Sequence, residues 1–143
     1  MNDVIGAAAV WDVEVLARTV FGEARGESDA GKAAVAWVWV NRSRDHQRRW
    51  PATVAGCCLQ PLQASAWNTN NTNRAKCIAA DETDPTFATC LATARLVLAG
   101  DLVDPADGAT HYLTETLAET MPPSWFNPAK VVARIGHHMF LKL

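Results

Sequence analysis

One acidic residue in the sequence has the placement that acid–base chemistry requires. Glu23 lies in the segment VEVLARTVFGEARGE, residues 13–27. Apolar residues recur there at the spacing of one helix face, and Glu23 falls at the border of that face. Partial burial and the negative end of the helix dipole both favour the neutral acid at this position. A proton-donating general acid needs that environment, although a solvated glutamate paired with a neighbouring arginine fits the same pattern.

A second group of residues has the types expected around a bound sugar. The segment LQPLQASAWN, residues 59–68, brings Gln63 and Ser65 together with the aromatic side chain of Trp67. Sugar hydroxyl and acetamido groups need amide and hydroxyl partners, while the apolar face of a sugar ring packs on an indole. A buried structural loop is an equally common source of these residue types.

The histidines allow a different chemistry. His111, His137 and His138 together with Glu23 could bind zinc, and the protein would then be a metal-dependent amidase. In a continuous strand over residues 131–141, the two adjacent histidines point to opposite faces. At most one of them could therefore join His111 on a metal, so we expect no metal and no cofactor.

Two further carboxylates, Glu27 and Asp107, could serve as a second catalytic group. Hydrolysis of a glycosidic bond generally uses two carboxylates at a defined separation. No pattern places either residue near Glu23, and capping or surface solvation is the more common role of such side chains.

The elements that must position these residues are mainly helices in the first two thirds of the chain. Asp12 is the expected N-cap of the first helix, and Gly26 the expected left-handed stop after Arg25. Ser28 predicts the N-cap of a second helix, which is apolar on every side and therefore runs through the core. The expected helices cover residues 13–25, 29–41, a short segment after Thr53, about one turn over 75–80, and 85–99, the last between an Asp84-Pro85 start and Gly100.

The last third of the chain favours strands. Residues 108–114 and 131–141 are β-leaning, and we expect the second run to be one alternating strand with a bulge at Gly136. Helices followed by a small antiparallel sheet give an α+β fold.

Composition limits the classes of partner. The chain has 143 residues, which suits one domain, and its net charge of −2 predicts no nucleic-acid partner. The first ten residues lack the basic region of a signal peptide, and no apolar run is long enough to span a membrane. We expect a monomer that is made in the cytosol and does not insert stably into a membrane.

Four cysteines allow three pairings, and their spacing matches neither a paired zinc site nor a dense disulfide scaffold. We expect all four to be reduced, with Cys90 packed in its helix. A bridge between Cys77 and Cys90 is the alternative in an oxidising space.

Several motifs follow one another along the chain: LARTVFGEARGES, GKAAVAWVWVNR, RWPATVAGCCLQPLQASAWN, GATHYL, PPSW and IGHHMF. Together they resemble the SleB-type cell wall hydrolase family of spore cortex-lytic enzymes. The resemblance covers residues 16–140 and implies one lysozyme-like, lytic-transglycosylase-related catalytic domain over residues 1–143. The implied substrate is peptidoglycan, cleaved between N-acetylmuramic acid and N-acetylglucosamine.

The resemblance also implies roles for single residues. Glu23 matches the family's catalytic glutamate, which would act first as acid and then as base. Gln63, Ser65, His111 and Tyr112 match family-like cleft positions. A lysozyme-type hydrolase with a second carboxylate is the alternative within this class, and a non-catalytic module that binds the cell wall through its aromatic side chains is the alternative outside it.

The sequence departs from the family pattern in two respects. Ala64 and Ala66 stand where an aromatic residue and a cysteine are usual, so substrate contacts around Ser65 are expected to differ. We also expect the chain to lack the separate wall-binding domain and export signal that are typical of spore enzymes. This favours a phage or prophage endolysin, released to the wall through a membrane lesion made by another protein.

Overall fold

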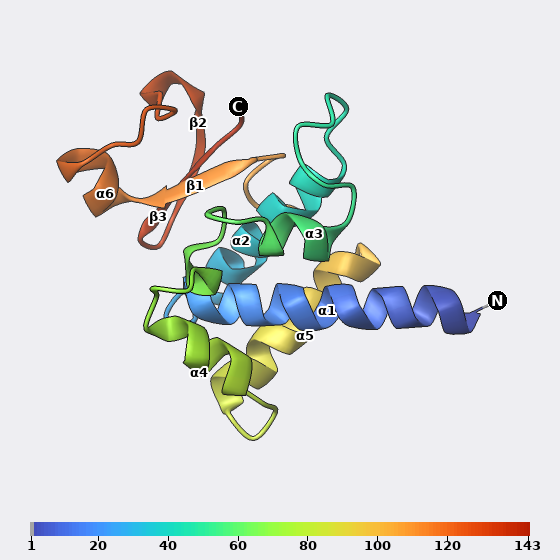
Figure 1. Ribbon diagram of the computed structural model, residues 1–143. Coiled ribbons are helices and arrows are strands. Elements are labelled where there is room, and N and C mark those ends of the chain that lie inside the picture. Colours follow the sequence, from blue (N-terminus) through green and yellow to red (C-terminus); the bar gives the residue numbers. More distant parts are fainter. Residues whose placement is uncertain (1) are drawn as a thin grey trace.

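The computed structural model describes residues 2–143 and, within the first helix, side chains from residue 10 onward. Helices dominate, and a small antiparallel sheet follows them, which confirms the predicted α+β class. The sheet and α6 lie together on one side of the other helices (Figure 1). The elements are α1 (Asn2–Ala24), α2 (Asp29–Ser43), α3 (Val54–Leu59), η1 (Ser65–Trp67), α4 (Asn73–Ala79), α5 (Pro85–Ala99), β1 (His111–Thr114), α6 (Glu115–Thr120), η2 (Pro128–Lys130), β2 (Val131–Ile135) and β3 (His138–Leu141).

Helix α1 is longer than expected at its N-terminus. It begins at Asn2, so the predicted N-cap at Asp12 is wrong. The apolar and alanine-rich residues before Asp12 are good helix formers, and the helix continues through them. Asp12 instead accepts a hydrogen bond from the free backbone N–H of Ala55 at the start of α3, at 3.0 Å. The carboxylate that the sequence predicts as the cap of α1 therefore binds a backbone N–H group of α3.

The end of α1 lies where the pattern predicts it. The helix stops at Ala24, and the backbone N–H of Glu27 donates to the Ala24 carbonyl at 2.9 Å. The expected left-handed conformation at Gly26 is wrong, because its φ is not positive. Glu23 therefore occupies the last turn of α1, as predicted.

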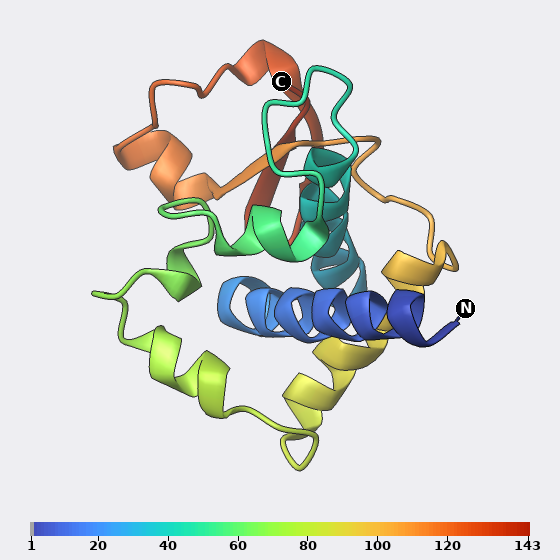
Figure 2. The ribbon, with the colours of Figure 1, turned by 45° about the vertical axis from the view of Figure 1, so that its right-hand side comes forward.

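The other long helices confirm their sequence signals. Ser28 Oγ accepts a hydrogen bond from the Gly31 N–H at 3.1 Å and so caps α2, most of whose apolar residues are buried. Asp84 caps α5, which ends at Gly100 in the left-handed conformation with a φ of 77°. Helix α1 packs against both α2 and α5 and crosses the middle of the helical part (Figure 2).

The sheet differs from the single long strand expected over 131–141. A tight turn at Gly136 and His137 divides this segment into β2 and β3, which pair in antiparallel fashion. Gly136 has a φ of 57°, which reverses the chain instead of making a bulge. The strand order is β1-β3-β2, and Tyr112 of β1 pairs with Phe140 of β3.

All four cysteines are free thiols and are buried, with Cys90 packed inside α5 as expected. Burial raises the pKa of Cys58 to about 12 and the pKa values of Cys57 and Cys90 to about 11. Within the described residues, no helix is both long and apolar enough to cross a bilayer.

Candidate active site

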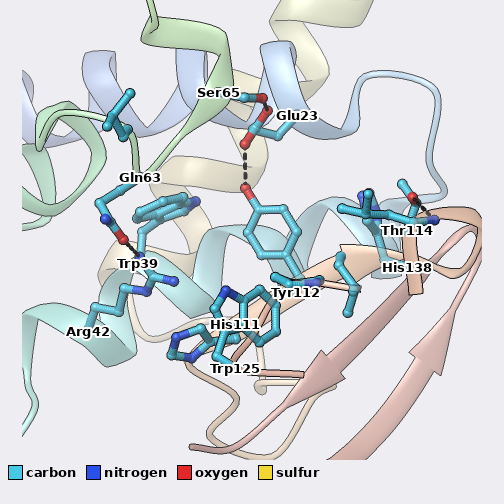
Figure 3. Close-up of a pocket in the computed structure, with 14 residues that line it drawn as sticks. Glu23, Trp39, Arg42, Gln63, Ser65, His111, Tyr112, Thr114, Trp125 and His138 are labelled. Carbon is cyan, nitrogen blue, oxygen red and sulfur yellow. Dashed lines mark hydrogen bonds between the residues drawn. The ribbon is translucent and has the colours of Figure 1, made fainter. Parts of the chain in front are cut away.

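A cleft of about 520 Å³ lies between the end of α1 and the sheet. It brings together five of the residues that the sequence predicts for the site. They come from distant parts of the chain and point toward a common space (Figure 3). The five are Glu23, Gln63, Ser65, His111 and Tyr112, and the cleft is also lined by Trp39, Arg42, Leu62, Leu113, Thr114, Leu117, Pro123, Trp125 and His138.

The carboxyl group of Glu23 is held by two hydroxyl groups. Ser65 Oγ donates to Glu23 Oε2 at 2.9 Å, and the Tyr112 hydroxyl donates to Glu23 Oε1 at 2.8 Å. A hydroxyl group can both donate and accept a hydrogen bond. Both partners can therefore stay in place when the carboxyl group gains or loses a proton, which suits a group that acts as acid and then as base.

Tyr112 reaches Glu23 from the sheet and remains a hydrogen-bond donor. Burial raises the pKa of Tyr112 well above its ordinary value, and the neighbouring charge of Glu23 adds to this shift. Its ring packs edge-on against His138 at 5.4 Å and Trp39 at 6.2 Å between centroids. The phenol thus stays protonated near neutral pH, with its ring fixed from two sides.

Ser65 reaches Glu23 because Gly22 has no side chain. A Cβ atom at Gly22 would lie 2.4 Å from Ala66 Cβ and 2.7 Å from Cys77 Sγ. Real Cβ atoms do not approach so closely, so η1 and α4 could not pack against α1 in this way if the residue were larger. The glycine of the FGEA motif, which the sequence analysis did not single out, therefore positions the loop that carries Ser65.

Arg42 lines the cleft, and the sequence analysis did not assign it to the site. It is only 6% exposed. Its guanidinium lies 4.7 Å from the Trp39 ring centroid and 5.0 Å from that of Trp50. Its Nη1 donates to Gln63 Oε1 at 3.0 Å, and its Nε donates to the Thr110 carbonyl at 2.7 Å. The aromatic residues on either side of Arg42 in the sequence were the available signal.

His111 lies in the cleft wall between two indoles. Its ring centroid is 4.8 Å from that of Trp125 and 5.7 Å from that of Trp50. Burial lowers the pKa of His111 to about 4, and the positive charges of Arg42 and Arg49 act in the same direction. The imidazole is therefore neutral at neutral pH and offers the cleft a flat, uncharged surface.

The low pKa of His111 makes stability depend on pH. Between pH 6.5 and 4 this histidine takes up a proton in the unfolded chain but stays neutral in the folded protein, so stability falls as the pH is lowered. We expect the thermal unfolding midpoint to decrease less over this range in His111→Gln than in the wild type. Circular dichroism melts at several pH values measure this, with His46→Gln at an exposed position as the control. Equal pH slopes in His111→Gln and the wild type would contradict the assignment.

Trp67 does not line the cleft. Its Nε1 donates to Thr19 Oγ1 of α1 at 2.9 Å, and its ring packs against the core. The indole in the cleft is that of Trp125, which is 36% exposed and is in contact with His111. The aromatic surface in the cleft therefore comes from Trp125 of the PPSW segment and not from Trp67.

Glu27 binds the turn between β2 and β3. The Glu27 side chain is 7% exposed, and its carboxylate accepts a hydrogen bond from the His137 backbone N–H at 2.9 Å and pairs with His137 Nδ1 at 2.8 Å. His138 Nδ1 lies 3.5 Å from the same carboxylate, so the two histidines do not face opposite sides as expected. A Cβ at Gly136 would lie 2.3 Å from Glu27 Oε1, so this close approach requires glycine.

The charges of this group follow from its contacts. Burial alone would raise the pKa of Glu27, but the hydrogen bonds from His137 and the charge of His138 bring it below its ordinary value. The same hydrogen bond raises the pKa of His137, whereas burial lowers that of His138. Glu27 is thus an ionised group that joins the end of α1 to the sheet.

The structure does not bring the proposed zinc ligands together. His111 lies between the two indoles, while His137 is 85% exposed on the turn beside Glu27. In the part of the chain that the structure describes, no three His, Cys, Asp or Glu side chains are grouped so as to hold a metal ion. Asp107, the other candidate carboxylate, lies in a turn with a φ of 48° and does not line the cleft.

Comparison with protein-family sequence models matches residues 26–141 to the family described as Cell Wall Hydrolase. The chain belongs to the cell wall hydrolase family. Glu23 lies just before the matched range, so the family model does not cover this residue.

Curated relatives of this cell wall hydrolase include two spore cortex-lytic enzymes. The one from Halalkalibacterium halodurans is 32% identical over 131 residues, and the one from Bacillus subtilis is 32% identical over 129 residues. Each alignment covers 90% of this chain but only 34% and 37% of the respective relative. The chain thus spans about a third of the length of these proteins.

Solved structures of similar fold include two SleB catalytic domains. The domain of the germination-specific lytic transglycosylase SleB from Bacillus anthracis has a TM-score of 0.70 and 27% identity, with 92% of this chain and 94% of that chain covered. The catalytic domain of the Bacillus cereus SleB protein has a TM-score of 0.66 and 26% identity, with 92% and 90% covered. These similarities confirm the expected lysozyme-like architecture.

Proposed function

We propose that this chain cleaves the glycan strands of peptidoglycan between N-acetylmuramic acid and N-acetylglucosamine. We further propose a lytic transglycosylase mechanism, in which Glu23 acts as acid and then as base. The observation that carries the proposal is the carboxyl group of Glu23, which lies in the cleft between two hydroxyl donors from different elements. Membership of the cell wall hydrolase family supports peptidoglycan as the substrate.

In the first step, protonated Glu23 gives its proton to the bridging oxygen as the bond to the anomeric carbon breaks. Positive charge then develops at the anomeric carbon. The newly ionised carboxylate accepts hydrogen bonds from Ser65 and Tyr112, which stabilise its charge without any movement of the backbone.

In the second step, the C6 hydroxyl of the same sugar forms a bond to the anomeric carbon, and Glu23 takes up the hydroxyl proton. This restores the acid and leaves a 1,6-anhydro sugar. Among the described residues that line the cleft, Glu23 is the only carboxylic acid, and Glu27 is engaged by the two histidines. Attack by a group already held in place benefits from a high effective molarity and needs no second carboxylate to activate water.

The product distinguishes this mechanism from hydrolysis. We expect muropeptides released from purified sacculi to end in 1,6-anhydro-muramic acid, lighter by one water than the hydrolytic product and inert to borohydride. Mass spectrometry before and after borohydride treatment measures both properties. Reducible muramic acid ends would instead indicate a lysozyme-type hydrolase, and Glu27 and Asp107 would then be tested as the second carboxylate.

The same digestion tests the amidase alternative. We expect the release of glycan fragments to continue in the presence of EDTA. Loss of activity on chelation, recovery on addition of zinc, and products cut between the glycan and the peptide stem would together identify a metal-dependent amidase.

A further inference from the structure

The side-chain amide of Gln63 has a fixed polarity in the cleft. Arg42 can only donate hydrogen bonds, so the Gln63 atom that faces its Nη1 at 3.0 Å must be the carbonyl oxygen. The NH₂ group of the same amide is then directed away from Arg42. Figure 3 shows the contact between Gln63 and Arg42. Because Gln63 lines the cleft and is an exposed residue, its NH₂ group can serve a ligand as a hydrogen-bond donor.

Arg42 is held in place, so its hydrogen bond to Gln63 is fixed. Its guanidinium is stacked between Trp39 and Trp50, and its Nε donates to the Thr110 carbonyl at 2.7 Å. An arginine that is 6% exposed and bonded on two sides can neither leave the site nor accept a hydrogen bond. Leu62, just before Gln63, has a left-handed φ of 67°, so the backbone of this loop also adopts a specific conformation.

We propose that Arg42 is a specificity-determining residue, which orients Gln63 so that its amide NH₂ binds the acetamido carbonyl of an N-acetylated sugar. The cleft consequently selects N-acetylated glycan strands over de-N-acetylated strands. This inference rests on the proposed function, because it concerns the sugar bound in the same cleft as Glu23.

The chemistry of the two substrates explains the selection. An acetamido group offers a carbonyl acceptor to the Gln63 donor. Removal of the acetyl group leaves an ammonium group, which has donors only and would face both the NH₂ of Gln63 and the positive charge of Arg42. Loss of one hydrogen bond and the added repulsion predict a preference of about tenfold or more in kcat/KM for the acetylated strand.

The variant Gln63→Glu tests directly whether Gln63 offers a hydrogen-bond donor to the sugar. One carboxylate oxygen keeps the contact with Arg42, and the other replaces the NH₂ group, so a donor becomes a charged acceptor of nearly the same shape. We expect kcat/KM on acetylated strands to fall about tenfold, mainly through KM, and kcat/KM on de-N-acetylated strands to rise. The preference between the two substrates should therefore reverse.

The substrates are one batch of sacculi in three forms: native, de-N-acetylated, and re-acetylated with acetic anhydride. Gln47→Glu makes the same charge change at an exposed position outside the cleft, and we expect it to keep the wild-type preference. Thermal melts confirm that each variant is folded.

The outcomes separate the two proposals. Equal cleavage of native and de-N-acetylated strands by the wild type, or an unchanged preference in Gln63→Glu, would overturn the role of Arg42 and Gln63 but leave the glycan-cleaving function intact. If the wild type cleaves neither form, the proposed function fails. Calorimetric binding of N-acetylated and de-N-acetylated glucosamine oligomers to the wild type and Gln63→Glu then decides the selectivity, and equal affinities would refute it.

Discussion

Replacement of Glu23 by glutamine is expected to lower glycan-strand cleavage by about a thousandfold, in the range found for the loss of a general acid or base. Glutamine has nearly the same shape, but its amide can neither give a proton to the bridging oxygen nor take one from the C6 hydroxyl. Its carbonyl oxygen can accept a hydrogen bond from one of the two hydroxyl groups and its NH₂ group can donate to the other, so both contacts can be kept. We expect a free energy of unfolding within about 1 kcal/mol of the wild type, because a partly exposed residue contributes little to packing.

Release of soluble muropeptides, measured per mole of folded protein, checks this prediction. Glu14→Gln is the matched control, since Glu14 lies on the same helix and is paired with Arg18 outside the cleft. Its activity should equal that of the wild type. A folded Glu23→Gln variant with full activity would refute the assignment of the catalytic acid.

Replacement of Gly22 by alanine is expected to reduce both stability and activity. The new methyl group would overlap Ala66 and Cys77, so η1 and α4 must move away from α1, at a cost of about 1–3 kcal/mol. Movement of η1 withdraws Ser65 from Glu23, and we expect kcat to fall about tenfold in the protein that remains folded, the scale of one lost hydrogen bond to the reacting group.

Gly26→Ala provides a matched comparison four residues further along. Its Cβ would meet no atom within 4 Å, and its φ is not positive, so we expect almost unchanged stability and activity. Denaturant unfolding and kcat measured at saturating substrate test the pair. The close packing at Gly22 would be disproved if both alanine variants behaved alike. Ser65→Ala then shows how much of the loss in Gly22→Ala comes from the serine.

Local signals in the sequence predicted much of the fold. Ser28 and Asp84 cap the helices that follow them, and the apolar run of α2 is buried, because each feature depends on residues a few positions apart. The prediction of one continuous strand through residue 136 was wrong for a different reason. Alternation of residue types is the same for one long strand and for two strands of a hairpin, and only the positive φ of Gly136 separates them.

The site was predicted less completely, because its geometry depends on contacts between distant segments. Glu23 could be found from its place on the helix face, but its partner Tyr112 is 89 positions away. Arg42 is enclosed between the indoles of Trp39 and Trp50 only in the folded chain. Trp67 carried the right residue type for a sugar platform, but its hydrogen bond to Thr19 turns it toward the core.

The contact between Glu27 and the β2–β3 turn has a consequence for the order in which the site forms. Helices can form early from short-range interactions, whereas the bonds from Glu27 to His137 join residues 110 positions apart. Tyr112 meets Glu23 only when the sheet, whose turn Glu27 holds, has docked on α1. In a chain whose helices have formed but whose sheet has not docked, Ser65 would still donate a hydrogen bond to one oxygen of Glu23. Water would hydrate the other oxygen. We therefore expect cleaving activity only in chains in which the sheet has docked on α1.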